Sequence, residues 1–94
     1  MSGYVQAVAL TGSDQAVRAG QGYYRGFTIR ETAGAAAVVV IYDNASAASG
    51  TVLEQVSLGA NESAREFYPS AIFAAAGIYV DVVSGTVAGS VRIG

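Results

Sequence analysis

The sequence of 94 residues contains no histidine, cysteine, lysine or tryptophan. Without histidine and cysteine it has neither a Ser–His–Asp nor a Cys–His nucleophile system, and it has no ordinary zinc site. Without lysine it lacks the phosphate-binding lysine of nucleotide-binding loops and a Schiff-base residue. These absences predict a protein that is not an enzyme and that needs no metal and no cofactor.

Charged residues are also scarce, at 13% of the sequence. The five arginines and seven acidic residues give a net charge of −2. This sign is unfavourable for a protein that binds nucleic acid by neutralising phosphates. The longest apolar run covers the eight residues 35–42, far fewer than the ~20 that a membrane-spanning helix needs. We therefore expect neither nucleic acid nor a membrane as a partner.

The residues that are present favour β-strands, since 52% are hydrophobic and many are β-branched. Apolar and polar residues alternate over 27–30 and 78–83, as in half-buried strands. Residues 36–42 are continuously apolar and predict a strand covered on both faces. Further strands are expected over residues 5–10, 52–58, 65–68 and 86–93.

Small and polar residues separate these strands. Residues 11–14, 20–22 and 43–50 are expected to be loops. Ser84 and Gly85 predict a tight hairpin between the last two strands, because glycine tolerates positive φ. The segment 70–76, which follows Pro69, predicts an irregular or short helical crossing.

The number of short strands predicts one all-β domain over residues 1–94, an antiparallel β-sandwich of six to eight strands. The pattern does not decide between a jelly-roll and an immunoglobulin-like topology. Residues 1–22 would form an N-terminal arm or an edge strand. The expected core consists of Val8, Phe27, Ile29, Val39, Ile41, Leu53, Val56, Ile78, Val80, Val82, Val87, Val91 and Ile93.

Two sets of carboxylates have the chemistry of a site. The three aspartates offer oxygen ligands for a metal, but they lack the spacing of a calcium loop. Two of the glutamates could form a glycosidase pair, but nothing in their spacing selects two of them. Hydrogen bonding in turn-like loops explains Asp14 and Asp43 better than a metal site does, and a single core of this size leaves little room for a sugar cleft. The residues considered are Asp14, Asp43, Asp81, Glu31, Glu62 and Glu66.

Aromatic and arginine residues are the remaining candidates for binding. Aromatic clusters at residues 23–24 and 67–68 could stack on bases or sugars, although the net acidity disfavours bases and a sandwich core also uses aromatics. Arginine binds carboxylates bidentately, across strands or across a subunit boundary. The arginines considered are Arg25, Arg30, Arg65 and Arg92.

The chain resembles a known family of proteins in three stretches. These are the sequence Arg-Glu-Thr-Ala-Gly at 30–34 and the segments 40–51 and 77–85. It resembles small proteins encoded among the virion-structure genes of tailed bacteriophages, especially those of actinobacteria, over about residues 20–94. The resemblance implies a virion component, either a capsid decoration (cement) protein or the base of a head fibre. It carries over no functional residues.

A decoration protein implies assembly in the host cytoplasm and a final place on the capsid surface of the virion. Its partners would be the major capsid protein and copies of itself, most simply as a homotrimer at three-fold points. The high apolar content agrees with subunit contacts. We expect these contacts along the apolar N-terminal segment, which could add to a sheet edge, and in the loop 43–50. The residues expected there are Tyr4, Val5, Val8, Leu10, Asp43, Asn44 and Ser46.

Two other virion roles are compatible with the sequence. A β module on the tail or a fibre would bind a receptor or a carbohydrate, and exposed aromatics along one face would favour it. A head–tail connector or tail component would form rings around the tail axis.

Overall fold

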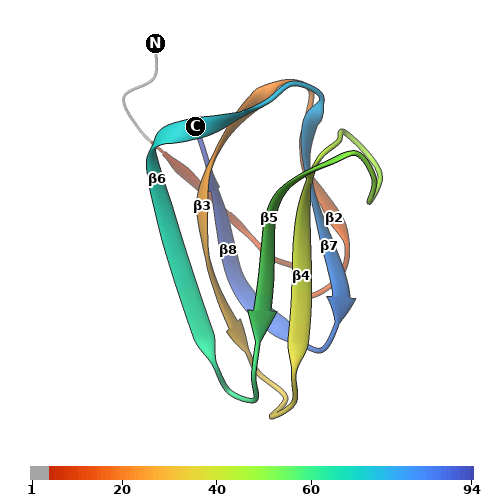
Figure 1. The fold of residues 1–94 in the computed structure, drawn as a ribbon, viewed down its shortest axis with the longest axis vertical. Helices are drawn as coiled ribbons and strands as arrows, with labels where there is room; N and C mark the ends of the chain where they lie inside the picture. The colour runs from red at the N-terminus through yellow and green to blue at the C-terminus, as the bar shows by residue number, and fades with distance from the viewer. Residues whose placement is uncertain (1–4) are drawn as a thin grey trace.

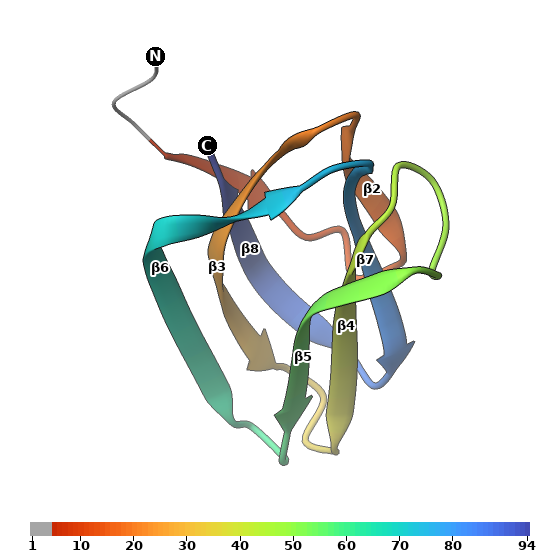
Figure 2. The same ribbon diagram turned by 45° about the horizontal axis from the view of Figure 1, so that its top comes forward.

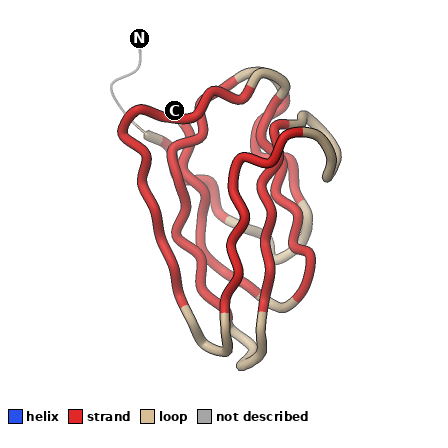
Figure 3. Tube along the Cα trace, in the orientation of Figure 1, coloured by secondary structure: helices blue, strands red, loops and turns tan. Residues whose placement is uncertain are grey.

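The computed structural model describes residues 5–94 and is built entirely from β-strands and loops (Figures 1 and 3). No helix within this range is long and apolar enough to cross a membrane. The strands are β1 (Gln6–Ala9), β2 (Gln15–Ala19), β3 (Gly22–Glu31), β4 (Ala37–Asp43), β5 (Thr51–Leu58), β6 (Ser63–Ala74), β7 (Gly77–Ser84) and β8 (Val87–Ile93).

The strands form two four-stranded sheets, and Figure 2 shows β6, β3 and β8 of one sheet on the left and β5, β4 and β7 of the other on the right. The first sheet has the order β1-β8-β3-β6 and the second has the order β2-β7-β4-β5. All neighbouring strands are antiparallel. The prediction of an all-β antiparallel sandwich is confirmed. The strand β2 was not predicted, because its sequence Gln-Ala-Val-Arg-Ala carries too few apolar residues to show alternation.

The strand pairs are nested, since β4 pairs with β5, β3 with β6, β2 with β7 and β1 with β8. The chain is therefore one long hairpin, folded back at the β4–β5 loop and rolled into two sheets. Only the β4–β5 connection joins neighbours within one sheet, and the other connections cross between the sheets. This arrangement is the jelly-roll topology, and it differs from the immunoglobulin-like alternative.

The hairpin predicted at Ser84 and Gly85 is wrong, because β7 lies in the second sheet and β8 in the first. The local turn signal is real, and Gly85 adopts φ +82°. A Cβ atom at Gly85 would lie 2.6 Å from the carbonyl oxygen of Ala36. The turn thus crosses tightly between the sheets against the start of β4. Which strands it joins depends on pairing partners that the turn does not specify.

The core lies between the two sheets and matches most of the prediction. Val8, Leu53 and Val82 are only partly buried, because they pack against the rim of the core. The residues of the core cluster that alternation missed lie at strand ends or beside polar neighbours: Tyr24, Ala37, Leu58 and Ala74. Val40 is also buried, but it does not belong to this cluster.

The strand β6 continues to Ala74 and bends sharply at a corner (Figure 1). The short helix considered for residues 70–76 is therefore wrong, whereas the irregular alternative describes the corner, where Ala71 has positive φ. Tyr24 pairs with Ile72 and Gly26 with Phe67, so the single residue Arg25 opposes residues 68–71 of β6. Arg25 Nη1 donates a hydrogen bond of 3.0 Å to the carbonyl oxygen of Pro69 inside the corner. Proline interrupts the ladder here and produces a bend in place of a helix.

Ala71 has a left-handed backbone in this corner, with φ +49°. A left-handed backbone conformation is sterically unfavourable for alanine, because of its Cβ atom, but not for glycine. We expect Ala71→Gly to raise the free energy of unfolding by about 0.5–1 kcal/mol. Urea denaturation followed by circular dichroism measures this, with Ala64→Gly of the same strand as the control. That control should lower stability, and an equal loss in both variants would contradict the proposed relief of strain.

Candidate binding surfaces

The strand β1 forms one edge of the first sheet and pairs only with β8. Leu10 N–H donates to the carbonyl oxygen of Gly89 at 2.9 Å. In an antiparallel ladder the bonded pairs alternate, so Gln6 and Val8 also bond to β8. The backbone groups of Ala7 and Ala9 therefore point toward the open edge.

The open edge of β1 lacks the features that usually protect a sheet edge from other strands. The edge strands β2, β5 and β6 each contain a charged residue and a register shift. The sequence Gln-Ala-Val-Ala of β1 has no charge and no proline, and its pairing with β8 has no register shift. Gln15 Nε2 donates a hydrogen bond of 3.1 Å to the carbonyl oxygen of Ala9, so this backbone group of the edge is already paired. Ala7 is the residue at which another strand could pair.

The predicted N-terminal contact residues have different places in the fold. Tyr4 lies outside the described residues, and Val5 is half-buried. Val8 and Leu10 pack against the core. These two side chains face inward, so a partner at this edge would meet backbone groups and the side chains that point outward.

Of the predicted loop residues, Asp43 and Asn44 use their side chains within the protein, whereas Ser46 is exposed. The Asp43 carboxylate accepts N–H groups of residues 75–77, the shortest at 2.8 Å from Ala76. These bonds, that from Ala76 above all, hold the pKa of Asp43 below its usual range. Asn44 Oδ1 accepts the backbone N–H groups of Ser46 and Ala47, both at 2.9 Å. Asp43 and Asn44 therefore shape the loop, and contact through it would come from its exposed residues.

The three aspartates considered as metal ligands are divided between two places. Asp43 is bound to residues 75–77, whereas Asp14 Oδ1 accepts the Val82 N–H at 2.8 Å. Burial, followed by the nearby charge of Asp14, raises the pKa of Asp81. Within residues 5–94 no group of three potential ligands from histidine, cysteine, aspartate and glutamate comes together.

Glu31 is buried, with 4% of its surface exposed, and it joins two loops. Its carboxylate accepts N–H groups of Ala33 at 2.7 Å, Gly34 at 2.8 Å and Asn61 at 2.8 Å. These bonds, that from Asn61 first, lower the pKa of Glu31. Glu62 likewise accepts the Gly59 N–H at 2.6 Å. Two of the three glutamates considered for a glycosidase pair, Glu31 and Glu62, thus hold turns together.

The lowered pKa values of Glu31 and Asp43 predict acid sensitivity. Such carboxylates stabilise the fold above their unfolded pKa, and this contribution is lost as the pH falls through their folded pKa. We expect the melting temperature to fall as the pH drops below about 4. Glu31→Gln should lower it at pH 7 and make its decline with acidification shallower, because a glutamine NH₂ faces backbone donors. Parallel curves for the two proteins would contradict this role of Glu31.

Glu54 closes the side of the sandwich between β5 and β6. Its Oε1 accepts the hydroxyl groups of Tyr68 at 2.7 Å and Tyr24 at 3.2 Å. Burial raises the pKa of Tyr24, and the hydrogen bond to Glu54 raises the pKa of Tyr68 to about 12. Tyr24 and Tyr68 are thus interior aromatics, whereas their sequence neighbours Tyr23 and Phe67 point outward.

The outer face of the first sheet collects three of the five arginines and no acidic side chain among the positions that the register places there. We call this surface the arginine face. Arg30 on β3, Arg65 on β6 and Arg92 on β8 lie on neighbouring strands. The outward positions are Ala7, Ala9, Tyr23, Gly26, Thr28, Arg30, Ser63, Arg65, Phe67, Phe73, Ala88, Ser90 and Arg92.

Exposed aromatic side chains lie on the same side of the sheet. Tyr23 and Phe73 pair across β3 and β6 beyond the β6 corner, with ring centroids 5.6 Å apart. Phe67 lies before the corner and is 52% exposed. Half-exposed aromatic rings on one sheet face are typical of a binding surface.

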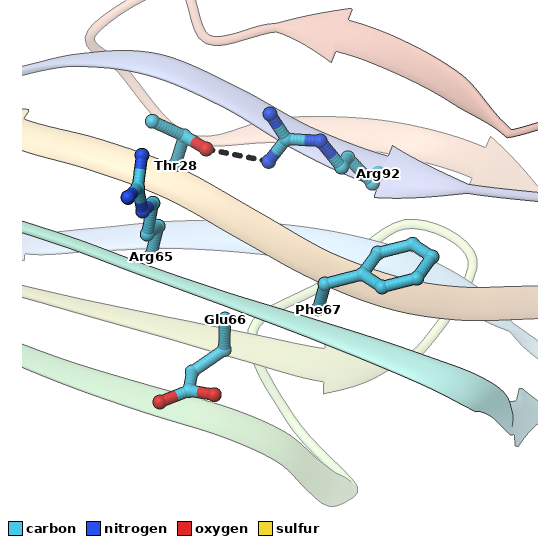
Figure 4. A pocket seen from close by; sticks show the side chains of 5 residues that line it. All are labelled: Thr28, Arg65, Glu66, Phe67 and Arg92. Carbon is cyan, nitrogen blue, oxygen red and sulfur yellow. Dashed lines mark hydrogen bonds between the residues drawn. The ribbon is translucent and has the colours of Figure 1, made fainter.

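A pocket of about 380 Å³ opens on the arginine face (Figure 4). Phe67, Arg65 and Arg92 surround it, and Arg92 Nη1 donates a hydrogen bond to Thr28 Oγ1. The Glu66 side chain points to the opposite side of β6, so only its remaining atoms border the pocket. The sequence indicated that Thr28 and Arg92 alternate with core residues, but it assigned no face to Arg65 and Phe67 and did not indicate that these side chains meet.

The fold and these surfaces define a small jelly-roll sandwich with an open strand edge and a cationic, aromatic sheet face. Comparison of the chain with protein-family models, with curated proteins and with solved structures finds no match.

Proposed function

We propose that this protein is a structural component of a bacteriophage virion, a decoration protein that attaches to the outer capsid surface and has no enzymatic activity. The observation that carries the proposal is the open, uncharged edge of β1. The resemblance of segments 30–34, 40–51 and 77–85 to virion proteins supplies the setting. The jelly roll is also an architecture found in capsid proteins.

Attachment would proceed by strand addition, with an extended segment of the capsid protein pairing with Ala7. Because β1 has four residues, one such contact supplies few hydrogen bonds and is weak. Three copies joined as a trimer would act together through their effective concentration. Such a trimer would bridge neighbouring capsomers, so that separating them would also require breaking its contacts.

The loop 44–50 suits a second contact with the same surface. Figures 1 and 2 place the start of β1 and this loop toward the same end of the sandwich, on opposite sides of it. Residues 47–50 are exposed, and Asn44 and Asp43 hold the loop in shape. A capsid surface across this end would meet both.

The location is tested on purified particles of the phage that encodes the protein. Electron cryomicroscopy and quantitative gel densitometry should find it on the capsid exterior at three-fold points, in numbers comparable to the capsid protein. Placement at the portal or tail, or a copy number far below that of the capsid protein, would reject decoration. That outcome would favour the connector or fibre roles.

The role of the β1 edge is tested with Ala7→Pro, which removes the open N–H without breaking a bond to β8. We expect binding to undecorated particles to fall at least about tenfold, since strand addition depends on these bonds. Ala60→Pro is the matched control. Ala60 lies in a turn that is closed by the hydrogen bond from the Glu62 N–H to the Gly59 carbonyl oxygen, and it precedes Asn61, which has φ +58°. Proline is favoured at this position of such a turn. Equal binding by both variants would exclude the β1 edge.

A β module that binds a receptor or carbohydrate is the second candidate. The three half-exposed aromatic side chains on the arginine face favour it. This role and capsid attachment use different surfaces of the sandwich.

A further inference from the structure

We propose that the pocket on the arginine face binds a carboxylated saccharide, the uronic acid residue of an acidic polysaccharide. This site is separate from the β1 edge and does not depend on attachment to a capsid. Its volume of about 380 Å³ falls within the range of small-ligand sites, roughly 300–1,000 Å³.

One aromatic ring and two guanidinium groups border the pocket. Phe67, Gly26 and Arg92 form one row across β6, β3 and β8. Adjacent strands are about 4.8 Å apart, so Phe67 and Arg92 stand roughly 10 Å from each other across the glycine. The next row contains Arg65 and Thr28. A flat ring can therefore lie over the sheet among Phe67, Arg65 and Arg92.

The charged side chains of the arginine face favour an anionic ligand. Arg65 and Arg92 border the pocket, Arg30 lies one further row along β3, and the outward positions of the sheet contain no carboxylate. Guanidinium groups bind carboxylates through two parallel hydrogen bonds. Arg92 is also oriented by its hydrogen bond to Thr28, which reduces the side-chain entropy lost on binding. The ligand therefore carries a carboxylate.

The aromatic ring favours a sugar over an acidic peptide or a nucleic acid. Phe67 is 52% exposed beside the pocket and offers an apolar surface to the C–H groups of a pyranose ring. A glutamate side chain presents no comparable flat face. Nucleic acid is disfavoured by the net charge of −2.

The test measures binding of the soluble protein by affinity electrophoresis and calorimetry with polygalacturonate, alginate and hyaluronate. We expect at least one of these to bind, and neutral dextran not to bind. Arg65→Gln and Arg92→Gln should each weaken binding at least about tenfold, as expected for a lost charged hydrogen bond. Phe67→Ala should weaken it about five- to tenfold.

Arg18→Gln is the matched control, because it removes the same charge from β2 in the other sheet. It should bind like the wild type, and melting curves should show that all variants remain folded. The proposal is overturned if none of the three polyuronates binds, or if the double variant of Arg65 and Arg92 binds unchanged. It is also overturned if dextran or polyglutamate binds as tightly, since the site would then recognise no saccharide carboxylate. None of these results depends on the virion role.

Discussion

Replacement of Gly26 by alanine is expected to remove most of the stability of the fold. Gly26 has φ +130°, and a Cβ atom there would lie 2.1 Å from the Glu66 carbonyl oxygen and 2.9 Å from its carbon. These are backbone atoms, so β3 and β6 would have to separate where they pair. We expect a loss of about 3–5 kcal/mol, the sum of backbone strain and overpacking. Domains of this size have roughly 5–15 kcal/mol in total.

Gly20→Ala isolates the steric part of this loss. Gly20 also has positive φ, +112°, but nothing lies within 4 Å of its added Cβ atom. Its variant should lose only about 1 kcal/mol of backbone strain. Urea titration followed by circular dichroism gives both values. If the two variants lose the same free energy, contact between Gly26 and Glu66 is not what requires glycine.

The second large effect is expected in the core, at Ile41 of β4. Ile41 is fully buried and lies between β5 and β7 in the second sheet. Ile41→Ala should lower the free energy of unfolding by about 2–4 kcal/mol, through lost burial and the cavity that remains. For a domain of this size each kcal/mol shifts the melting temperature by about 4–8 °C.

Val83→Ala is the control for core truncation, because Val83 on β7 is 56% exposed. It should change stability by less than about 0.5 kcal/mol. Val80, which is fully buried on the same strand, should behave like Ile41 when truncated to alanine, with a smaller loss because fewer atoms are removed. Equal effects at Val80 and Val83 would contradict the placement of the core.

The strands with clear alternation were predictable from the sequence because the pattern is local. β7 shows it directly, since Ile78 and Val80 point into the core while Tyr79 points away. The jelly-roll order was not predictable, because it depends on which distant strand each one pairs with. Ser84 and Gly85 signalled a turn correctly, but only the pairing of β7 with β4 and of β8 with β3 makes it a crossing between sheets.

The two candidate binding surfaces also differ in how far the sequence predicts them. An edge at the N-terminal strand was expected from its position and apolar sequence. The pocket was not, because Thr28, Arg65 and Arg92 come from three separate segments and meet only through the register of β6, β3 and β8. The roles of Glu31 and Asp43 were hidden for a related reason. Each accepts a backbone N–H group from a loop distant in the sequence, Asn61 for Glu31 and Ala76 for Asp43, and such donors carry no sequence signature.

The nested pairing also sets an order in which the fold can assemble and open. β4 and β5 are consecutive in the chain, so of the four nested pairs theirs closes the shortest segment of chain. Their contact therefore costs the least chain entropy and is expected to form earliest. Each further pair closes a longer loop, and the pairing of Gln6 with Ile93 joins almost the two ends of the chain. β1 should therefore dock last and exchange its amide hydrogens first. A partner strand at that edge would slow the first opening step, so attachment would also lengthen the lifetime of the folded protein.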